Sequence, residues 1–279
     1  MNRLFLLLFF ASFSLFSHAI NAIVNNIEYK INFEAKQVEI VRFRSSAASV
    51  VIPSSIFVRG KNYQVTSIQD RAFAGCKSLT SVVIPHSVTS IGYEAFSGCK
   101  SLTSIVIPNS VTIIEGRAFV YCDALTSVTL PISVTKFGAR VFGDCTSLTS
   151  IKFPQGMTSI PRGTCSGCKS LTSVTIPNSV TSIEEWAFKD CVSLTSLTIP
   201  EKVSKLFSWA FEGCIALKTV TFLSPTPPKA WSNPKFCAKH ATICVPAGAK
   251  KAYLTLGAED YNEYTWVSQY FEYIREINK

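Results

Sequence analysis

The chain has 279 residues, of which 47% are hydrophobic and 16% charged, and its formal net charge at pH 7 is +9. This balance excludes a disordered chain and leaves enough apolar residues for a sizeable core. The basic residues are spread along the sequence without a block of Lys and Arg, so we do not expect a nucleic-acid-binding groove.

Residues 1–19 have the order of a secretory signal peptide. Arg3 precedes an apolar run from Leu4 to Phe16, and the small residue Ala19 follows it. The run has about 13 residues, whereas a membrane-spanning helix needs about 20. We expect cleavage after Ala19, or after Ala22. The mature chain should then be exported without a transmembrane anchor, because no later segment is apolar enough to span a bilayer.

Residues 20–65 are rich in strand patterns. Ile27 to Phe33 and Val38 to Phe43 alternate apolar with polar residues, which predicts a β-hairpin. Because the ends of a repeat solenoid need polar covers, we interpret this segment as an N-terminal cap.

A period of 23 residues runs through residues 66–223 without an insertion or deletion. Three columns of identical residues carry it: Cys76, Cys99, Cys122, Cys145, Cys168, Cys191, Cys214 and Cys237; Leu79, Leu102, Leu125, Leu148, Leu171, Leu194 and Leu217; and Pro85, Pro108, Pro131, Pro154, Pro177 and Pro200.

Residues 72–92 show how one unit folds. Leu79, Val82 and Ile84 have the spacing of a leucine-rich repeat, in which Val82 and Ile84 point inward from a short strand. Pro85 ends that strand, because it has no N–H to donate to a neighbouring strand.

The rest of the unit brings the chain back. Val88 and Ile91 return toward the core, while Ala72, Phe73 and Cys76 have the spacing of a short helical turn. No single coil can bury these residues, so the coils must stack. We predict an α/β repeat solenoid. It would be a right-handed leucine-rich-repeat coil with a parallel β-sheet on one face, short helical or irregular returns, and a cap at each end.

The fifth unit departs from the pattern. Cys165 stands in the Phe column and Thr164 in the Ala column, while Gly156, Met157 and Pro161 interrupt the usual return. We expect a local bend or a thinner core there.

Residues 224–279 break the period and are interpreted as a C-terminal cap. Pro246 to Leu256 has the pattern of a short helix. Cys237 and Cys244 lie close in sequence near this end and are candidates for a structural disulfide.

The unit resembles that of BspA-like leucine-rich repeat proteins, which follow A-F-x-x-C-x-S-L-T-S-V-x-I-P-x-S-V-T-S-I. The resemblance covers residues 66–223, and the flanking VVIPSSI and CVPAGAKKAY are similar to those of Bacteroidetes-type members. It implies a cell-surface protein of a family implicated in attachment to host matrix proteins, in co-aggregation with other microbes and in triggering innate receptors. It supplies no defined binding residue.

The cysteines of the repeat column should be buried and inert. Neighbouring coils would hold their Cβ atoms about 4.8 Å apart, beyond the roughly 3.5 to 4.5 Å of a disulfide. Cys165 and Cys168 have a C-x-x-C spacing, but without the strand-helix context of a redox enzyme a structural disulfide is the better interpretation.

We find no sequence signature of an enzyme and expect no cofactor and no metal site. His86 follows a strand and is interpreted as a solvated turn residue. The acidic residues of the returns are expected to be exposed: Asp70, Glu94, Glu115, Glu184 and Glu201.

The outward side of the predicted sheet is the candidate binding face. It presents small hydroxyl and methyl groups, which also suit any half-exposed strand. Its residues are Ser81, Val83, Ser104, Val106, Ser127, Thr129, Ser150, Lys152, Ser173, Thr175, Ser196, Thr198, Thr219 and Thr221. Aromatic residues of the returns could supply a second surface: Tyr93, Tyr121, Trp186 and Trp209.

Three functions remain open at this point. The first is an exported, adhesin-like protein that contacts extracellular or cell-surface proteins through the solenoid. The second is a glycan-binding or envelope-associated structural protein without a host protein ligand. The third, a hydrolase, requires a clustered pair of carboxylates on one surface.

Overall fold

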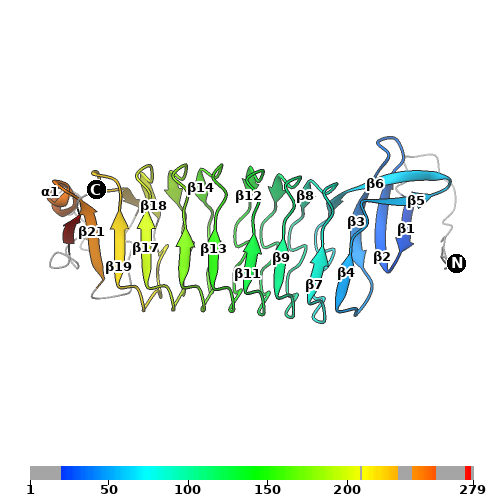
Figure 1. Cartoon of the computed structure of the whole chain (residues 1–279), viewed down its shortest axis with the longest axis horizontal. Coiled ribbons are helices and arrows are strands. Elements are labelled where there is room, and N and C mark those ends of the chain that lie inside the picture. The colour runs from blue at the N-terminus through cyan, green and yellow to red at the C-terminus, as the bar shows by residue number, and fades with distance from the viewer. Residues whose placement is uncertain (1–19, 208, 232–240, 256–273, 278–279) are drawn as a thin grey trace.

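The computed structural model describes residues 20–207, 209–231, 241–255 and 274–277. These residues form an elongated rod of stacked coils, with the first strands at one end and β21 and α1 at the other (Figure 1). The predicted signal peptide, residues 1–19, lies outside the described residues. In the part that the structure describes, no helix has the length and apolar character needed to cross a membrane.

The rod begins with antiparallel strands. β1 (Ile20–Val24) pairs with β2 (Ile27–Asn32), which pairs with β3 (Gln37–Phe43), so the predicted hairpin is confirmed. β5 (Ser55–Val58) and β6 (Lys61–Ile68) form a second hairpin, and β6 also lies parallel to β3. Through β6 this end joins the repeats.

Each repeat then places one short strand on the front face of the rod (Figure 1). In these strands the central residue packs inward and its two neighbours point out, as in β7, where Val82 is buried. The paired strands are parallel without a shift in register, because all coils after the first have the same length. They are β4 (Ser49–Val51), β7 (Ser81–Val83), β9 (Ser104–Val106), β11 (Ser127–Thr129), β13 (Ser150–Lys152), β15 (Ser173–Thr175), β17 (Ser196–Ile199) and β19 (Thr219–Phe222).

A second row of parallel strands lies on the other side of each coil. Their inward residues, such as Ile91 and Ile114, are buried. The row consists of β8 (Ser90–Ile91), β10 (Ile113–Ile114), β12 (Lys136–Phe137), β14 (Ser159–Ile160), β16 (Ser182–Ile183), β18 (Lys205–Phe207) and β20 (Lys229–Trp231). The molecule is therefore a β-solenoid with parallel strands on two sides.

The expected helical returns are not found in the described repeats. Arg71 and Gly75 have left-handed backbone angles, with φ of 58° and 71°, so only three residues stand between them. The N–H of Phe73 donates to the carbonyl oxygen of Ala95 in the next coil at 2.7 Å, instead of to its own coil. An α-helix needs successive bonds four residues apart along one segment. The α/β class is therefore not confirmed for the repeats, whose returns follow the irregular alternative of the prediction and are turns bonded from coil to coil.

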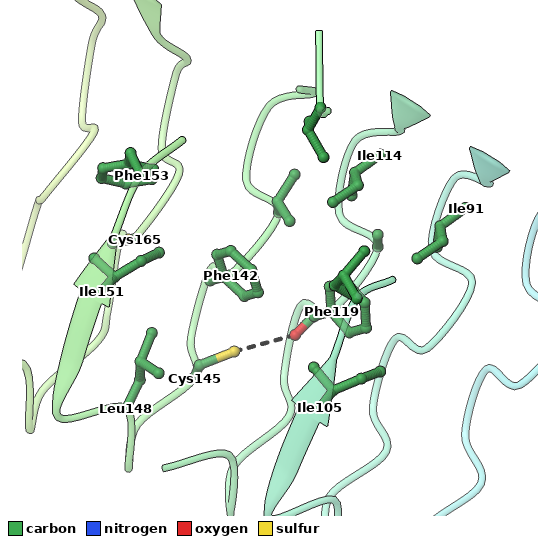
Figure 2. Packing of buried hydrophobic residues seen from close by; sticks show 14 of the residues in the cluster. Ile91, Ile105, Ile114, Phe119, Phe142, Cys145, Leu148, Ile151, Phe153 and Cys165 are labelled. Atoms are coloured by element: carbon green, nitrogen blue, oxygen red, sulfur yellow. Dashed lines mark hydrogen bonds between the residues drawn. The ribbon is translucent and has the colours of Figure 1, made fainter. Parts of the chain in front are cut away.

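Columns of identical side chains fill the interior. The rings of Phe73, Phe96, Phe119 and Phe142 stack from coil to coil with centroids 4.9, 5.3 and 5.6 Å apart. Beside them the thiol of Cys145 donates to the carbonyl oxygen of Phe119 at 3.1 Å (Figure 2). Equivalent thiol bonds occur in the neighbouring coils. The cysteine column thus gives a second hydrogen bond to carbonyl groups that already accept a backbone N–H of their own turn, as Phe119 accepts that of Cys122 at 3.4 Å.

The fifth unit interrupts both the second row of strands and the Phe column. β12 and β14 are not paired, and Pro161 occupies a position whose N–H elsewhere donates to the preceding coil, as Glu184 does to Ile160 at 2.9 Å. A thinner core does not result, because Phe153 points inward next to Cys165 (Figure 2). The aromatic contacts continue along a detour: Phe142 to Phe137 at 6.0 Å, Phe137 to Phe153 at 6.3 Å and Phe153 to Phe188 at 6.3 Å.

At the far end β21 (Thr242–Pro246) extends the front sheet and pairs with β22 (Ile274–Ile277). α1 (Lys250–Thr255) confirms the short helix predicted there. Tyr253 of α1 is fully buried, and its hydroxyl donates to the carbonyl oxygen of Ser224 at 2.9 Å. The proposed disulfide involves Cys237, which lies outside the described residues, so its pairing with Cys244 stays a prediction.

Candidate functional site

The front sheet exposes every residue that the sequence predicted for its outer side. Twelve of these side chains are exposed, and Thr219 and Thr221 are half-buried. We call this surface the sheet face. Whether it binds a partner is a separate question, because exposure alone does not make a surface a binding site.

The sheet face consists of two straight rows. The first, the hydroxyl row, contains only serine and threonine: Ser49, Ser81, Ser104, Ser127, Ser150, Ser173, Ser196, Thr219 and Thr242. The second, the mixed row, changes character along the rod: Val51, Val83, Val106, Thr129, Lys152, Thr175, Thr198 and Thr221. The alignment follows from the constant repeat length, which places equivalent residues directly beside each other.

The mixed row begins with an apolar patch. Val51, Val83 and Val106 are 70%, 56% and 65% exposed, and they come from the successive front strands β4, β7 and β9. Val51 was not among the predicted residues, although Ser49 to Pro53 has the same SVVIP sequence as Ser81 to Pro85. Three adjacent exposed valines are unusual on a surface otherwise covered with hydroxyl groups, and they give the face an apolar end.

A column of threonines just before the front strands is already committed to the fold. The hydroxyl of Thr126 donates to the carbonyl oxygen of Thr103 at 3.1 Å, and Thr149 and Thr172 repeat this bond to the preceding coil at 3.2 and 3.1 Å. These side chains stabilise the stack, so the hydroxyl row and the mixed row provide the groups that a partner can use.

The returns form a second border, which we call the left-handed edge and which is exposed at Arg71 and Trp209. At one position in each coil the residue has a positive φ, even though most of these residues are not glycine: Arg71, Glu94, Arg117, Arg140, Gly163, Trp186 and Trp209. Non-glycine residues in this conformation cost free energy, roughly 1 to 3 kcal/mol in the less favourable cases. Stacking from coil to coil offsets that cost.

The side chains of the left-handed edge contact one another along the rod. Glu94 lies between Arg71 and Arg117, with N···O distances of 2.8 and 3.1 Å. Burial opposes ionisation of Glu94, but these two guanidinium groups prevail and its pKa is lowered. Farther along, the indoles of Trp186 and Trp209 stack at 6.1 Å. The edge is therefore ordered, and its ring faces are partly occupied.

Most of the acidic side chains that the sequence singled out in the returns form local contacts. Asp70 accepts a hydrogen bond from the N–H of Tyr93, Glu115 pairs with Lys136, and Glu184 accepts from Ser182. Glu201 is exposed, as expected. Each of the first three carboxylates is engaged by its own coil or a neighbouring one.

The thiols and His86 show no catalytic arrangement. Cys165 and Cys168 are both free and fully buried, so the structure contains no disulfide between them. Burial raises the pKa of Cys165 and Cys145 well above the ordinary value, which keeps these thiols protonated. His86 is exposed. Within the described ranges, no three His, Cys, Asp or Glu side chains come together as metal ligands.

Comparison with known proteins gives the same architecture. Residues 66–172 and 158–237 match the BspA type leucine rich repeat region, in six copies. A leucine rich cell surface protein of Faecalibacterium prausnitzii is 29% identical, with a TM-score of 0.69 over 82% of this chain and 71% of that one. The leucine rich repeat protein of T. pallidum is 26% identical, with a TM-score of 0.54 over 86% and 96%.

A leucine-rich repeat protein of Bacteroides ovatus is also 26% identical, with a TM-score of 0.56 over 80% of this chain and 70% of that one. No curated protein sequence matches the chain significantly. The family match covers more than half of the chain and coincides with the coils described above. The chain belongs to the BspA type leucine-rich repeat family.

Proposed function

We propose that this protein is exported to the cell surface or secreted and binds an extracellular protein through the sheet face. The supporting observation is the apolar patch of Val51, Val83 and Val106 at one end of a flat array of free hydroxyl groups. Protein interfaces combine an apolar centre with a polar rim, and these two parts lie side by side here. The family suggests an interaction role, and the similar protein of F. prausnitzii is described as a cell surface protein.

The contact expected on this surface is extended and of modest affinity. The sheet face lacks the Trp, Tyr and Arg side chains that dominate tight interfaces. Many copies on one cell would compensate, because linked weak contacts give a much higher combined affinity. This combination fits attachment between surfaces better than capture of a soluble hormone-like ligand.

The test is binding of purified residues 20–279 to immobilised matrix proteins and to polysaccharides, at low and high salt. Val83→Lys with Val106→Lys should reduce capture of a protein ligand by about tenfold or more, since it removes the apolar patch. Ile132→Lys with Ile215→Lys is the matched control, because it adds the same two charges at residues that are each 70% exposed but lie on returns. Equal loss in both variants would count against the sheet face.

Salt decides between specific capture and adhesion by net charge, because exposed charges are screened at high ionic strength. Capture of a protein that saturates and survives high salt supports the proposal. Capture by polysaccharide alone would instead favour the alternative, a glycan-binding or envelope-associated structural protein without a host protein ligand.

A further inference from the structure

A pocket of about 490 Å³ lies at the C-terminal end of the second row of strands, away from the sheet face. Two lysines line it, Lys205 of β18 and Lys229 of β20. The strands are parallel, and these two residues are directly paired in register. The volume falls in the range of small-molecule sites, which is about 300 to 1,000 Å³.

Lys205 and Lys229 form no ion pair with any described residue. Lys136, in the same row of strands, binds Glu115 at 2.7 Å, and Arg71, Lys100, Arg162 and Lys189 also have carboxylate partners. Other lysines of the described coils, such as Lys152 and Lys218, also form no ion pair, but Lys205 and Lys229 lie directly opposite each other on adjacent strands. Like charges directly opposite each other on adjacent strands are destabilising, so an anion between them would relieve this repulsion.

The rest of the lining suits a sugar ring. Ser204 and Thr226 contribute hydroxyl groups, Glu201 contributes an acceptor, and Val203 and Pro227 contribute apolar surface. A simple inorganic anion would use only the cations and would leave the hydroxyl groups and the apolar surface of the lining without a contact. A nucleotide would need an aromatic side chain to stack on, and the described lining contains none.

One wall of the pocket is fixed by the core. Ser224, which is 7% exposed, lines the pocket, and its carbonyl oxygen accepts the hydroxyl of the buried Tyr253 at 2.9 Å. The Ser224 hydroxyl lies 3.1 Å from that of Thr226. The packing of α1 thus holds Ser224 and Thr226, whose carbonyl oxygens both accept the Tyr253 hydroxyl, and this reduces the entropy lost at this wall when a ligand binds.

We propose that this pocket binds an acidic sugar, with the carboxylate of a uronic acid unit between Lys205 and Lys229. The sugar hydroxyls face Glu201 and Thr226, and the C–H groups of the ring pack on Val203 and Pro227. This site is distinct from the sheet face, so the cell-surface protein would carry a glycan contact in addition to its protein contact.

The test measures binding of a galacturonic acid trimer to purified residues 20–279 by calorimetry at physiological salt. The methyl ester of the same trimer keeps the sugar but removes the charge, and inorganic phosphate keeps a charge without the sugar. Lys205→Gln with Lys229→Gln should weaken trimer binding by at least about tenfold, because charge-assisted hydrogen bonds are lost. The methyl ester should bind the native protein at least as weakly as the trimer binds the double variant.

Lys169→Gln with Lys218→Gln is the matched control, because it removes the same two charges from exposed residues outside the pocket. An equal loss in this control would overturn the proposal, since binding would then follow net charge. So would tight binding of phosphate without the trimer, or unchanged trimer binding by the double variant. Thermal unfolding checks the fold, and the double variant should be at least as stable as the native protein because the like charges are gone.

Discussion

The aromatic detour of the fifth unit gives the sharpest test of how the core is assembled. Phe153 fills the space that Cys165 leaves in the Phe column, and it makes edge-to-face contacts with Phe137 and Phe188 at 6.3 Å each. At the equivalent positions the coils that keep the column phenylalanine carry isoleucine or leucine, as in Ile107 and Leu130. The smaller side chain of Cys165 and the larger one of Phe153 therefore compensate each other in volume.

Phe153→Ile alone removes both aromatic contacts. At about 0.5 to 1.5 kcal/mol for each pair, the expected loss in free energy of unfolding is roughly 1 to 3 kcal/mol. Cys165→Phe alone places a ring where Phe153 already packs, and overpacking costs about 1 to 3 kcal/mol. The double variant restores the usual coil, so its unfolding free energy should lie within about 1 kcal/mol of the native value, well above the sum of the single losses.

The assay is urea unfolding of the native protein, both single variants and the double variant. The comparison of single and double variants needs a two-state transition, and a repeat protein can lose the cooperativity that this requires. Unfolding is therefore followed by circular dichroism and by tryptophan fluorescence, and the two transitions should coincide. Losses that add within about 0.5 kcal/mol would refute the reasoning, because they would show that the two positions do not share one space.

Three further predictions concern other parts of the rod. Cys76 should react with a thiol reagent in the native protein before Cys122 does. Cys76 is half-buried and a hydrogen bond with the Cys99 thiol lowers its pKa, whereas Cys122 is fully buried. Mass spectrometry of the labelled peptides measures the order of reaction. Glu94 has a lowered pKa in the fold, so its contribution to stability is present above the ordinary pKa of 4.5 and is lost as the pH falls through the folded pKa. In Glu94→Gln the melting temperature should therefore depend less on pH in that acid range, which thermal unfolding at several pH values measures. The mature chain should begin after Ala19, because β1 starts at Ile20 and cleavage after Ala22 would remove three of its five residues; N-terminal sequencing of the exported protein decides.

The front strands could be predicted from the sequence because polar and apolar residues alternate in them. Once the coil must bury its apolar residues, only one orientation of such a strand places the central residue inside. Val82 points inward and Ser81 outward in the structure, as that pattern requires. The columns of Leu, Phe and Cys follow from the same argument. The family match confirms the resemblance that these columns suggested.

The returns could not be predicted as reliably, because a closed turn and a helical turn place apolar residues at the same spacing. The two are distinguished by the backbone conformation at Arg71, and an arginine in the sequence does not predict a positive φ. The second row of strands was missed for a related reason. A strand of two residues, such as Ser90–Ile91, is too short to show alternation.

Two candidate binding groups were missed where the period changes. Val51 repeats the sequence context of Val83, but the hairpin of β5 and β6 separates the coils by 32 residues, as in the bond from Thr80 to Ala48. Lys205 and Lys229 become neighbours only through the strand pairing, because they lie outside the 23-residue spacing. Both signals needed the structure to place the residues side by side.

A strictly periodic surface has a weakness as a binding site. A ligand that contacts only the hydroxyl row could slide by one coil, about 4.8 Å, and find the same groups again. The mixed row removes this ambiguity, because its valines stand at one end and Lys152 introduces a charge in the middle. Specific recognition in this protein therefore has to depend on the positions where the repeat departs from its own pattern, and these are the positions that the variants above would change.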